Sequence, residues 1–149
     1  MQIVDITDKH GNIIALALLA RAESVHRELR PQLPADYMAR IQVVFAGGAR
    51  MCLALDGDEV VGIALWRLIE NTYEGKRLYV DDLVTHAPAR SKGVGKQLLI
   101  YLEQQARLLN CDVLALDSGV QRAAAHKFYF REGMQVSSFS FRKILEWML

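Results

Sequence analysis

The stretch Tyr79-Val-Asp-Asp-Leu-Val-Thr-His-Ala-Pro-Ala-Arg-Ser-Lys-Gly-Val-Gly-Lys-Gln-Leu-Leu99 decides the fold of this chain. It begins within an apolar run, Leu78 to Thr85, that predicts a strand. It ends in the first part of a helix, whose buried stripe is expected to be Val94, Leu98, Leu102, Ala106 and Leu109. Pro88 and Gly93 favour a loop between the two. The stretch therefore predicts a strand that leads through a glycine-containing loop into a helix.

Apolar periodicity on either side of this stretch predicts further helices and strands. Before it we expect a strand over residues 2–6, a helix over 35–46 and strands over 51–55 and 60–69. Another helix would follow Asp8 as its N-cap and bury Ile14, Leu18, Ala22, Val25 and Leu29. After the stretch we expect a strand over 113–116, a helix over 121–132, and two short strands over 135–139 and 141–145.

This order of elements predicts an α/β (α+β) fold in a single domain over residues 1–149. A strand–helix–strand crossover follows an antiparallel meander, so the sheet should be mixed, with helices on its faces. We expect about six to seven strands, flanked by about four helices.

The composition predicts a soluble protein without a general attraction to nucleic acid or to a membrane. The chain has 149 residues, of which 52% are hydrophobic and 23% charged, and its net charge is +1. The apolar run Ile13 to Ala20 is too short to span a bilayer, and no signal-peptide pattern is present. Cys52 and Cys111 lie in apolar runs and are expected to be buried thiols. We therefore expect a reduced, cytoplasmic protein.

The loop Arg90-Ser-Lys-Gly-Val-Gly95 has the composition of an anion site. Its glycines let backbone N–H groups surround an anion, and the helix N-terminus adds partial positive charge. Arg90, Lys92 and Lys96 add full charges, so a pyrophosphate would bind well. A glycine-rich turn with solvated charges would carry the same residues. Leu98 replaces the third glycine of a dinucleotide fingerprint, and the P-loop pattern is absent.

Two motifs in this chain resemble those of the GNAT N-acetyltransferase superfamily. Residues 79–99 look like its acetyl-CoA motif, an apolar strand followed by [RQ]-x-x-G-x-[GA] and a helix, with Arg90, Gly93 and Gly95 in the defining positions. Ala124-Ala-His-Lys-Phe-Tyr-Phe-Arg-Glu-Gly-Met134 resembles the second signature, A-x-x-x-Y-x-x-x-G-[FM]. The motifs occur in the family's order around an apolar strand, so the chain is identified as a member of this superfamily.

The resemblance implies that acetyl-CoA is the cofactor and implies which residues hold it. In this family two central strands splay apart and the cofactor lies in the gap. The backbone of Leu83, Val84 and Thr85 would bind the pantetheine arm. Ser118, just after a buried strand, is expected to touch the cofactor. The pyrophosphate would be surrounded by the backbone amides of Arg90, Ser91, Lys92, Gly93, Val94, Gly95 and Lys96.

The resemblance also implies a general acid. Tyr129 occupies the position at which the family motif places a tyrosine near the cofactor sulfur, where it would protonate the leaving thiolate and also contact the cofactor. The alternative is an aromatic side chain that packs with its neighbours, Phe128 and Phe130.

Asp81 and Asp82 are the candidates for the base that accepts the proton of the incoming ammonium, whose ordinary pKa is near ~10.4. Adjacent strand residues point to opposite faces, so we expect only one of them to face the amine. The pair resembles that of the diamine acetyltransferase type, which implies Asp81 as the base, acting through a bridging water, with Asp82 as the second candidate. The other acid would then anchor the acceptor or make structural bonds.

The acceptor is expected to be a small-molecule or peptide amine, and nothing in the sequence says which one. Candidates for its pocket are Trp66, Glu70, Tyr73, Glu74 and Tyr79, although a tryptophan in a strand more often packs in a core or on a dimer surface. The alternative function is a non-catalytic acyl-CoA sensor, against which the acids and Tyr129 argue. No metal-ligand spacing is present, so no metal is expected. A homodimer is expected because the C-terminal segment Phe141–Leu149 is rich in apolar residues.

Overall fold

The computed structural model describes residues 1–146, and these form two compact units. The second unit, from Asp117 onward, holds α4 (Ala123–Arg131). The first unit, Met1–Leu116, holds every other helix and strand described. In chain order these are β1 (Gln2–Asp5), α1 (Leu16–Leu29), α2 (Tyr37–Ala46), β2 (Arg50–Asp56), β3 (Glu59–Asn71), β4 (Gly75–Thr85), the 3-10 turn η1 (Ala87–Ala89), α3 (Val94–Leu108) and β5 (Val113–Leu116). The expected single domain over residues 1–149 stays a prediction.

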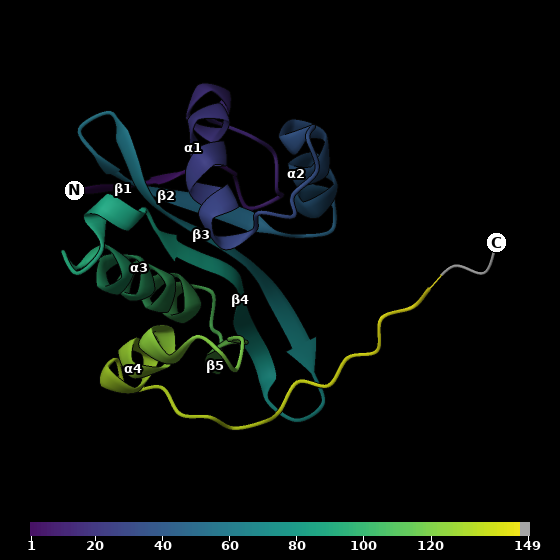
Figure 1. Ribbon diagram of the computed structural model, residues 1–149. Coiled ribbons are helices and arrows are strands. Elements are labelled where there is room, and N and C mark those ends of the chain that lie inside the picture. The colour runs from purple at the N-terminus through teal and green to yellow at the C-terminus, as the bar shows by residue number, and fades with distance from the viewer. Residues whose placement is uncertain (147–149) are drawn as a thin grey trace. The chain divides into compact units, whose positions relative to one another are not determined.

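The first unit is built on a five-stranded sheet in the order β1-β2-β3-β4-β5 (Figure 1). The strands from β1 to β4 form an antiparallel meander, whereas β5 pairs parallel with β4. The chain makes the crossover between these parallel strands through α3. The mixed sheet and the helices confirm the predicted fold class, although the sheet has fewer strands than expected.

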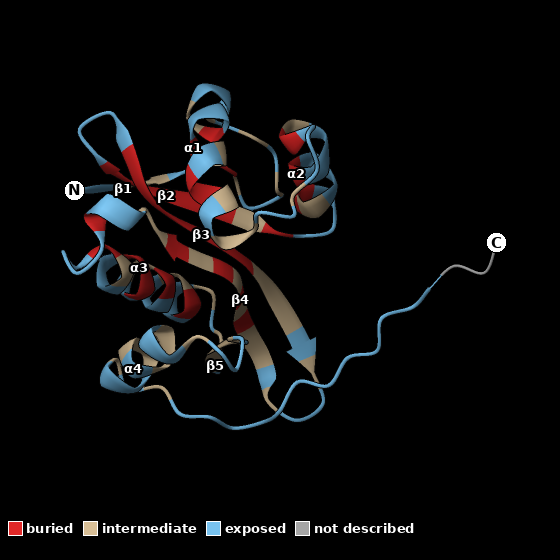
Figure 2. Cartoon of the chain, viewed as in Figure 1, coloured by how far each residue is buried: buried red, intermediate tan, exposed pale blue. Residues whose placement is uncertain are grey.

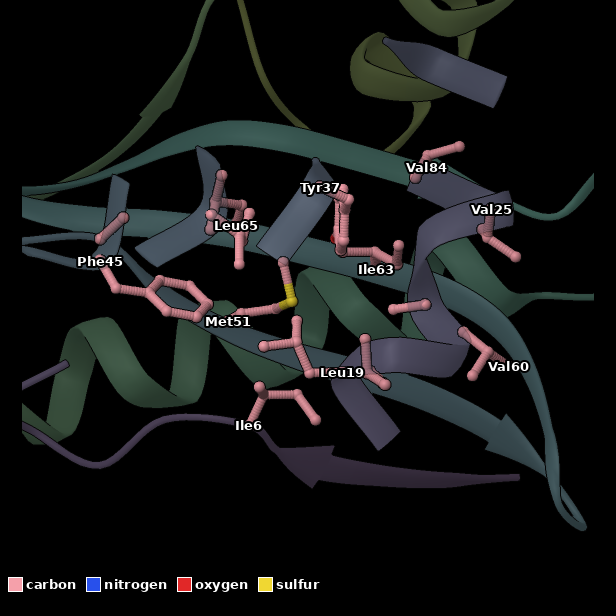
Figure 3. Close-up of a cluster of buried hydrophobic side chains, with 14 of the residues drawn as sticks. Ile6, Leu19, Val25, Tyr37, Phe45, Met51, Val60, Ile63, Leu65 and Val84 are labelled. Carbon is pink, nitrogen blue, oxygen red and sulfur yellow. The ribbon is translucent and has the colours of Figure 1, made fainter. Parts of the chain in front are cut away.

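Two separate cores cover the two faces of this sheet. One core joins α1 and α2 to the sheet through side chains such as Leu19, Tyr37 and Ile63 (Figure 3). The other joins α3 to the opposite face through side chains such as Trp66 and Leu98. Figure 2 shows buried residues along β2 and β3, which lie between these layers. Burying one large aliphatic side chain stabilises the fold by about 1.5–3 kcal/mol. Such side chains on both faces of the central strands therefore hold the helices against the sheet.

The first helix begins later than its sequence pattern predicts. Asp8 does not cap it; the Asp8 carboxylate instead accepts hydrogen bonds from the backbone N–H groups of His10 and Asn12 and closes a local turn. Ile14 therefore precedes the helix and is exposed. The buried residues of α1 are Leu19, Ala22, Val25 and His26.

Close packing of α3 against β3 positions the glycine-containing loop. A Cβ added to Gly62 of β3 would lie 2.7 Å from Cγ1 of Val94 and 2.9 Å from Cδ1 of Leu98. Only glycine lets the first turn of α3 approach the sheet this closely. At the other end Leu109 is the C-cap of α3, and Asn110 directly after it adopts a positive φ of 57°, a usual conformation just past the end of a helix.

The two closing strands predicted over residues 135–139 and 141–145 are wrong, because these residues have no regular structure. A strand needs a partner for its backbone, and the described part of the second unit contains no other strand. Phe139 and Phe141, which lie in these two segments, are exposed. The segment Phe141–Leu149 that underlies the expected homodimer is described only as far as Glu146, and residues 147–149 lie outside the described part.

Candidate active site

A β-bulge in β4 lies at one of the two predicted acids. Leu65 of β3 pairs with Asp82 and the next residue, Trp66, pairs with Val80, so Asp81 is the extra residue. An extra residue reverses the alternation of side chains along a strand. Val80 accordingly packs in the core on the α3 side, while Asp82, two residues later, contacts α1 on the opposite face.

Both acids lie on the α1 side of the sheet. Leu65 packs in the core on that side, and Arg67, two residues further along β3, extends from the same face. The Nε of Arg67 donates a hydrogen bond to Oδ2 of Asp81 over 2.8 Å. The expectation that Asp81 and Asp82 point to opposite faces is therefore wrong, because it assumed a strand without a bulge.

Asp82 is the buried centre of a hydrogen-bonded chain that reaches both N-terminal helices. Its Oδ2 accepts from Nε2 of His26 over 2.7 Å, and its Oδ1 accepts from Nε of Arg30 over 2.8 Å. Nδ1 of His26 lies 2.8 Å from the hydroxyl of Tyr37 in α2. His26 and Tyr37 are each almost wholly buried. The chain therefore joins α1, α2 and β4 at one point.

One arrangement of protons satisfies every member of this chain. A carboxylate can only accept, so Nε2 of His26 carries a proton and donates it to Asp82. Tyr37 then donates to Nδ1, which is possible only if His26 is neutral. An imidazolium would leave the Tyr37 hydroxyl without an acceptor among the described residues. Burial raises the pKa of Asp82, but the hydrogen bonds from His26 and Arg30, together with the charge of Arg30, outweigh burial and hold the pKa below its ordinary value.

Asp81 has the opposite electrostatic character. Burial raises the pKa of its carboxyl group above the ordinary aspartate value, and the neighbouring charge of Asp82 acts in the same direction, while Arg67 opposes both. The Asp81 side chain keeps 24% of its surface exposed, compared with 9% for Asp82. Asp81 is therefore the more accessible of the two acids and the stronger base.

The end of β4 continues past the end of its parallel neighbour. Pairing between β4 and β5 ends at Val80 and Leu116. Beyond that point Leu83, Val84 and Thr85, the predicted pantetheine residues, pair with β3 on the other side. The edge of β4 that faces β5 therefore extends beyond the paired region at these residues, as expected where two strands diverge. An unpaired strand edge of this kind can bind an extended chain that contains amide groups.

The predicted phosphate loop follows directly. Arg90 is extended, and Ser91 and Gly93 adopt positive φ angles of 63° and 84°. Arg90, Ser91, Lys92 and Lys96 are all exposed. A Cβ added to Gly93 would meet no protein atom within 4 Å, so the space in front of this backbone is open.

Backbone donors are available at the end of this loop. The first helical hydrogen bond of α3 runs from the N–H of Gln97 to the carbonyl of Gly93 over 3.0 Å. The N–H groups of Val94, Gly95 and Lys96 come before it and have no acceptor within the helix. The loop thus brings backbone donors and flexible cations together, as the pyrophosphate of acetyl-CoA requires.

Glu28 of α1 binds the residues at the start of this loop. The Glu28 carboxylate accepts from Nδ1 of His86 over 2.6 Å and from the N–H of Ala87 over 2.9 Å. Burial raises the pKa of Glu28, but these two hydrogen bonds, with the charges of His86 and Arg90, outweigh burial and lower it. The bulged strand and the loop are therefore both attached to α1.

The remaining predicted site residues belong to the second unit. Tyr129 lies in α4, where its ring lies 5.4 Å from the ring of Phe128. Burial raises the pKa of Tyr129 above its ordinary value, against a smaller opposite effect of Arg122, so the phenol is protonated at neutral pH. The Oγ of Ser118 is buried and has no hydrogen-bond partner in the described part of the chain. An unpaired buried hydroxyl suits a residue that contacts a ligand.

Several residues of the site were not found from the sequence. His26 occurs at a core position of an amphipathic helix, Arg30 follows that helix, Arg67 lies in a strand, and Tyr37 opens α2. Helix packing brings His26, Arg30 and Tyr37 to the acids and strand pairing brings Arg67. Sequence spacing carries no signal of either. The candidate Trp66 is buried on the α3 side beneath the guanidinium of Arg50, so the core alternative is correct for it.

Other features of the chain lie away from this site. A hollow of about 290 Å³ is lined by Asp5, Arg50, Trp66 and Tyr101, among others, and by none of the predicted catalytic or cofactor-binding residues. Cys52 is buried, as expected, and Cys111 is half-buried; both are free thiols. Among residues 1–146, no group of three or more His, Cys, Asp or Glu side chains is placed to hold a metal ion. In the same residues, no helix is both long and apolar enough to cross a membrane.

Comparison with known proteins identifies relatives for most of the chain. A model described as the Acetyltransferase (GNAT) family matches residues 11–134. An uncharacterized N-acetyltransferase of Bacillus subtilis (strain 168), YhdJ, is 35% identical over 127 residues, which cover 83% of this chain and 89% of the relative. The aminoalkylphosphonate N-acetyltransferase of Salmonella typhimurium (strain LT2) is 34% identical over 94 residues, which cover 62% of this chain and 61% of the relative.

Solved structures share the fold. The aminoglycoside N-acetyltransferase AAC(6')-Iy, solved in complex with CoA, superposes with a TM-score of 0.78 over 95% of this chain and 93% of its own. Its sequence identity is 17%, so this likeness concerns the fold alone.

Proposed function

Because this chain belongs to the acetyltransferase (GNAT) family, we propose that it transfers an acetyl group from acetyl-CoA to a primary amine, with Asp81 as base and Tyr129 as acid. Family membership makes the chain an acyltransferase that uses acetyl-CoA. The acceptor class and the roles of individual residues are the proposal. The names of the two relatives, both N-acetyltransferases, support an amine acceptor.

The residues of the loop and strand fit the cofactor. Backbone N–H groups from Val94 to Lys96, with Arg90 and Lys92, would hold the pyrophosphate, and the open space in front of Gly93 admits it. The edge of β4 from Leu83 to Thr85 would hold the pantetheine arm. When bound, acetyl-CoA supplies an acetyl group activated as a thioester.

Asp81 would deprotonate the acceptor. An alkylamine reaches the site as an ammonium ion and must lose a proton before it can act as a nucleophile. In the structure Arg67 contacts only Oδ2 of Asp81, so Oδ1 is open to that proton, received directly or through one water. The raised pKa of Asp81 brings it closer to the working pH than an ordinary aspartate, which favours general-base catalysis.

Asp82 would serve as a fixed negative charge. It is buried, its pKa is low and both of its oxygens are occupied by His26 and Arg30, so it is poorly suited to accept a proton. Tyr129 would donate the proton of its neutral phenol to the departing thiolate, and direct attack in a ternary complex requires no covalent enzyme intermediate. The single observation that carries this proposal is the bulge that places Asp81 beside the open end of β4.

The test follows thiol release from acetyl-CoA with a panel of primary amines. Asp81→Asn should lower kcat/KM at pH 7 by roughly a hundredfold or more, since general-base contributions are about 10²–10⁴. The deficit should shrink as the pH approaches the pKa of the amine, because the acceptor then arrives deprotonated. Asp58→Asn, in the exposed turn between β2 and β3, is the matched control and should behave like the unchanged protein. An Asp81→Asn variant with an unaltered pH profile would assign the base elsewhere.

A further inference from the structure

The charges around the acid pair cancel. Arg67 pairs with Asp81 at 2.8 Å and Arg30 pairs with Asp82 at 2.7 Å, and Nη2 of Arg30 also donates to the backbone carbonyl of Asp81 at 3.1 Å. His26 is neutral in the only arrangement that satisfies Tyr37. Two carboxylates therefore face two guanidinium groups. An ammonium ion that approaches them meets no net negative charge, so charge alone does not attract it.

The two ion pairs differ in how easily they can open. The Asp82 side chain is 9% exposed and is also bound by His26, so its pair with Arg30 is held in place. In the pair of Arg67 and Asp81 it is the acid that is more accessible than in the other pair: the Asp81 side chain is 24% exposed, whereas Arg67 is 30% exposed and Arg30 is 42% exposed. Arg67 pairs with Asp81 through Nε alone, and no other hydrogen bond or ion pair of its guanidinium is found among the described residues. The partner that an acceptor can displace is therefore Arg67.

The displacement of Arg67 from Asp81 by an amine also has a cost in free energy. The amine gains the carboxylate but leaves a partly buried guanidinium without a counter-ion, which costs free energy. A second anion would remove that cost, and the planar fork of Arg67 is suited to a carboxylate or a phosphonate bound through two oxygens.

We propose that the natural acceptor is a small zwitterion, a primary amine that carries a carboxylate or phosphonate, whose ammonium pairs with Asp81 while its anion pairs with Arg67. This inference rests on the proposed function and names the class of its acceptor. Binding exchanges one internal ion pair for two intermolecular ones and leaves no charge unpaired. Arg30 brings a second guanidinium group next to Asp81, since its Nη2 donates to the backbone carbonyl of that residue.

The same geometry disfavours polycations. A polyamine would bring additional positive charge to a site that already holds two guanidinium groups, and would leave Arg67 unpaired. The resemblance of the Asp81–Asp82 pair to the diamine acetyltransferase type suggests a cationic acceptor. The ion pairs seen here argue against it, because both carboxylates already carry a cation.

The experiment compares acceptors of similar size that differ in charge: 2-aminoethylphosphonate, β-alanine, propylamine and 1,4-diaminobutane. Each is assayed for kcat/KM with acetyl-CoA, and its Kd is measured by calorimetry in the presence of CoA. We expect at least one zwitterion to have a kcat/KM about tenfold to a hundredfold higher than that of propylamine and a Kd lower by a similar factor, the range of a charged hydrogen-bonded contact. The two zwitterions distinguish a phosphonate site from a carboxylate site.

Variants of Arg67 test the assignment. Arg67→Gln should bring the ratio of zwitterion to propylamine close to one, in kcat/KM and in Kd. Arg67→Lys retains the charge without the fork and should give an intermediate ratio. Arg107→Gln, which removes an exposed arginine paired with Glu103 on α3, is the matched control and should keep the full preference. Melting temperatures of all variants report whether each one folds.

The outcomes separate this inference from the proposed function. If amines are acetylated but propylamine or the diamine equals the zwitterions, the zwitterion assignment is overturned and the function stands. If zwitterions are preferred and Arg67→Gln keeps that preference, Arg67 is not the anion site and the proposal fails. If no amine is acetylated, the proposed function fails. The ratio of the Kd of propylamine to the Kd of a zwitterion, measured by calorimetry in the unchanged protein and in Arg67→Lys, still decides whether a zwitterion site exists.

Discussion

His26 donates a hydrogen bond from Nε2 to Oδ2 of Asp82 over 2.7 Å, and both side chains are almost wholly buried. This contact ties α1 to the strand that carries the bulge. Because Asp82 directly follows the bulged residue, the contact also fixes where Asp81 lies. A helix that covers the core on one face therefore also positions the proposed base.

Loss of His26 should destabilise the protein strongly. His26→Ala leaves the buried charge of Asp82 with Arg30 alone and should lower the free energy of unfolding by about 3 kcal/mol. Tyr37→Phe removes a single neutral hydrogen bond and should cost about 1 kcal/mol. Urea unfolding at pH 7 measures both. Equal costs for the two variants would show that His26 contributes packing rather than a partner for Asp82.

The contribution of Asp82 should depend on pH. The pKa of Asp82 is lower in the folded chain than in the unfolded chain, so its stabilisation is complete above the ordinary aspartate value of about 3.9 and is lost as the pH falls through the folded value. The difference in unfolding free energy between the unchanged protein and Asp82→Asn should thus be full at pH 5 to 7 and shrink below about pH 4. Urea titrations across this pH range test the direction in which the difference in unfolding free energy changes with pH. A difference that grows in acid would contradict the lowered pKa.

Gly93 should be needed for the cofactor more than for the fold. Gly93→Ala forces a side chain into a φ of 84° and should cost about 1 kcal/mol of stability. It also fills the open space in front of the loop, so CoA should bind at least tenfold more weakly and its thermal shift should disappear. Gly48→Ala is the matched control, since Gly48 has a φ of 107° and equally open surroundings. It should cost similar stability and leave CoA affinity intact; the same loss of affinity there would refute the loop assignment.

Tyr129→Phe should lower kcat by roughly tenfold to a thousandfold, the lower part of the range for general acids, because a thiolate is a fair leaving group even without a proton. The change keeps the ring, so the Kd for CoA and the melting temperature should hold. Tyr73→Phe, in the exposed turn between β3 and β4, serves as the control. Full activity of Tyr129→Phe would return Tyr129 to a packing role with Phe128.

The homodimer stays a prediction with its own measurement. Val136, Phe139, Phe141, Ile144 and Leu145 expose apolar side chains in the second unit. If a second copy covers them, light scattering at high micromolar concentration should give twice the chain mass. A monomeric mass would disprove the dimer and leave these side chains for another partner.

Local features of the fold could be predicted from the sequence, and features that depend on distant partners could not. The spacing of apolar residues correctly predicted α3, β5 and the antiparallel meander, because each of these burial patterns depends on residues that are close together in the sequence. The late start of α1 was missed because Asp8 had a local alternative, a turn with His10 and Asn12. The two strands predicted after Gly133 were wrong because a strand needs a partner, and the described part of the second unit contains none.

By itself the sequence determined the loop and the family, because both depend on residues that are neighbours in the chain. The spacing of Arg90, Gly93 and Gly95 sets the backbone and the charges of an anion site without reference to any other segment. Only the tertiary structure decided the roles of the acids. One inserted residue in the pairing of β3 with β4 brought Asp81 and Asp82 to a single face, where His26, Arg30 and Arg67 give one acid a low pKa and the other a displaceable partner. Those partners lie 14 to 56 residues away along the chain, so the electrostatics of the site arises from packing and not from sequence spacing.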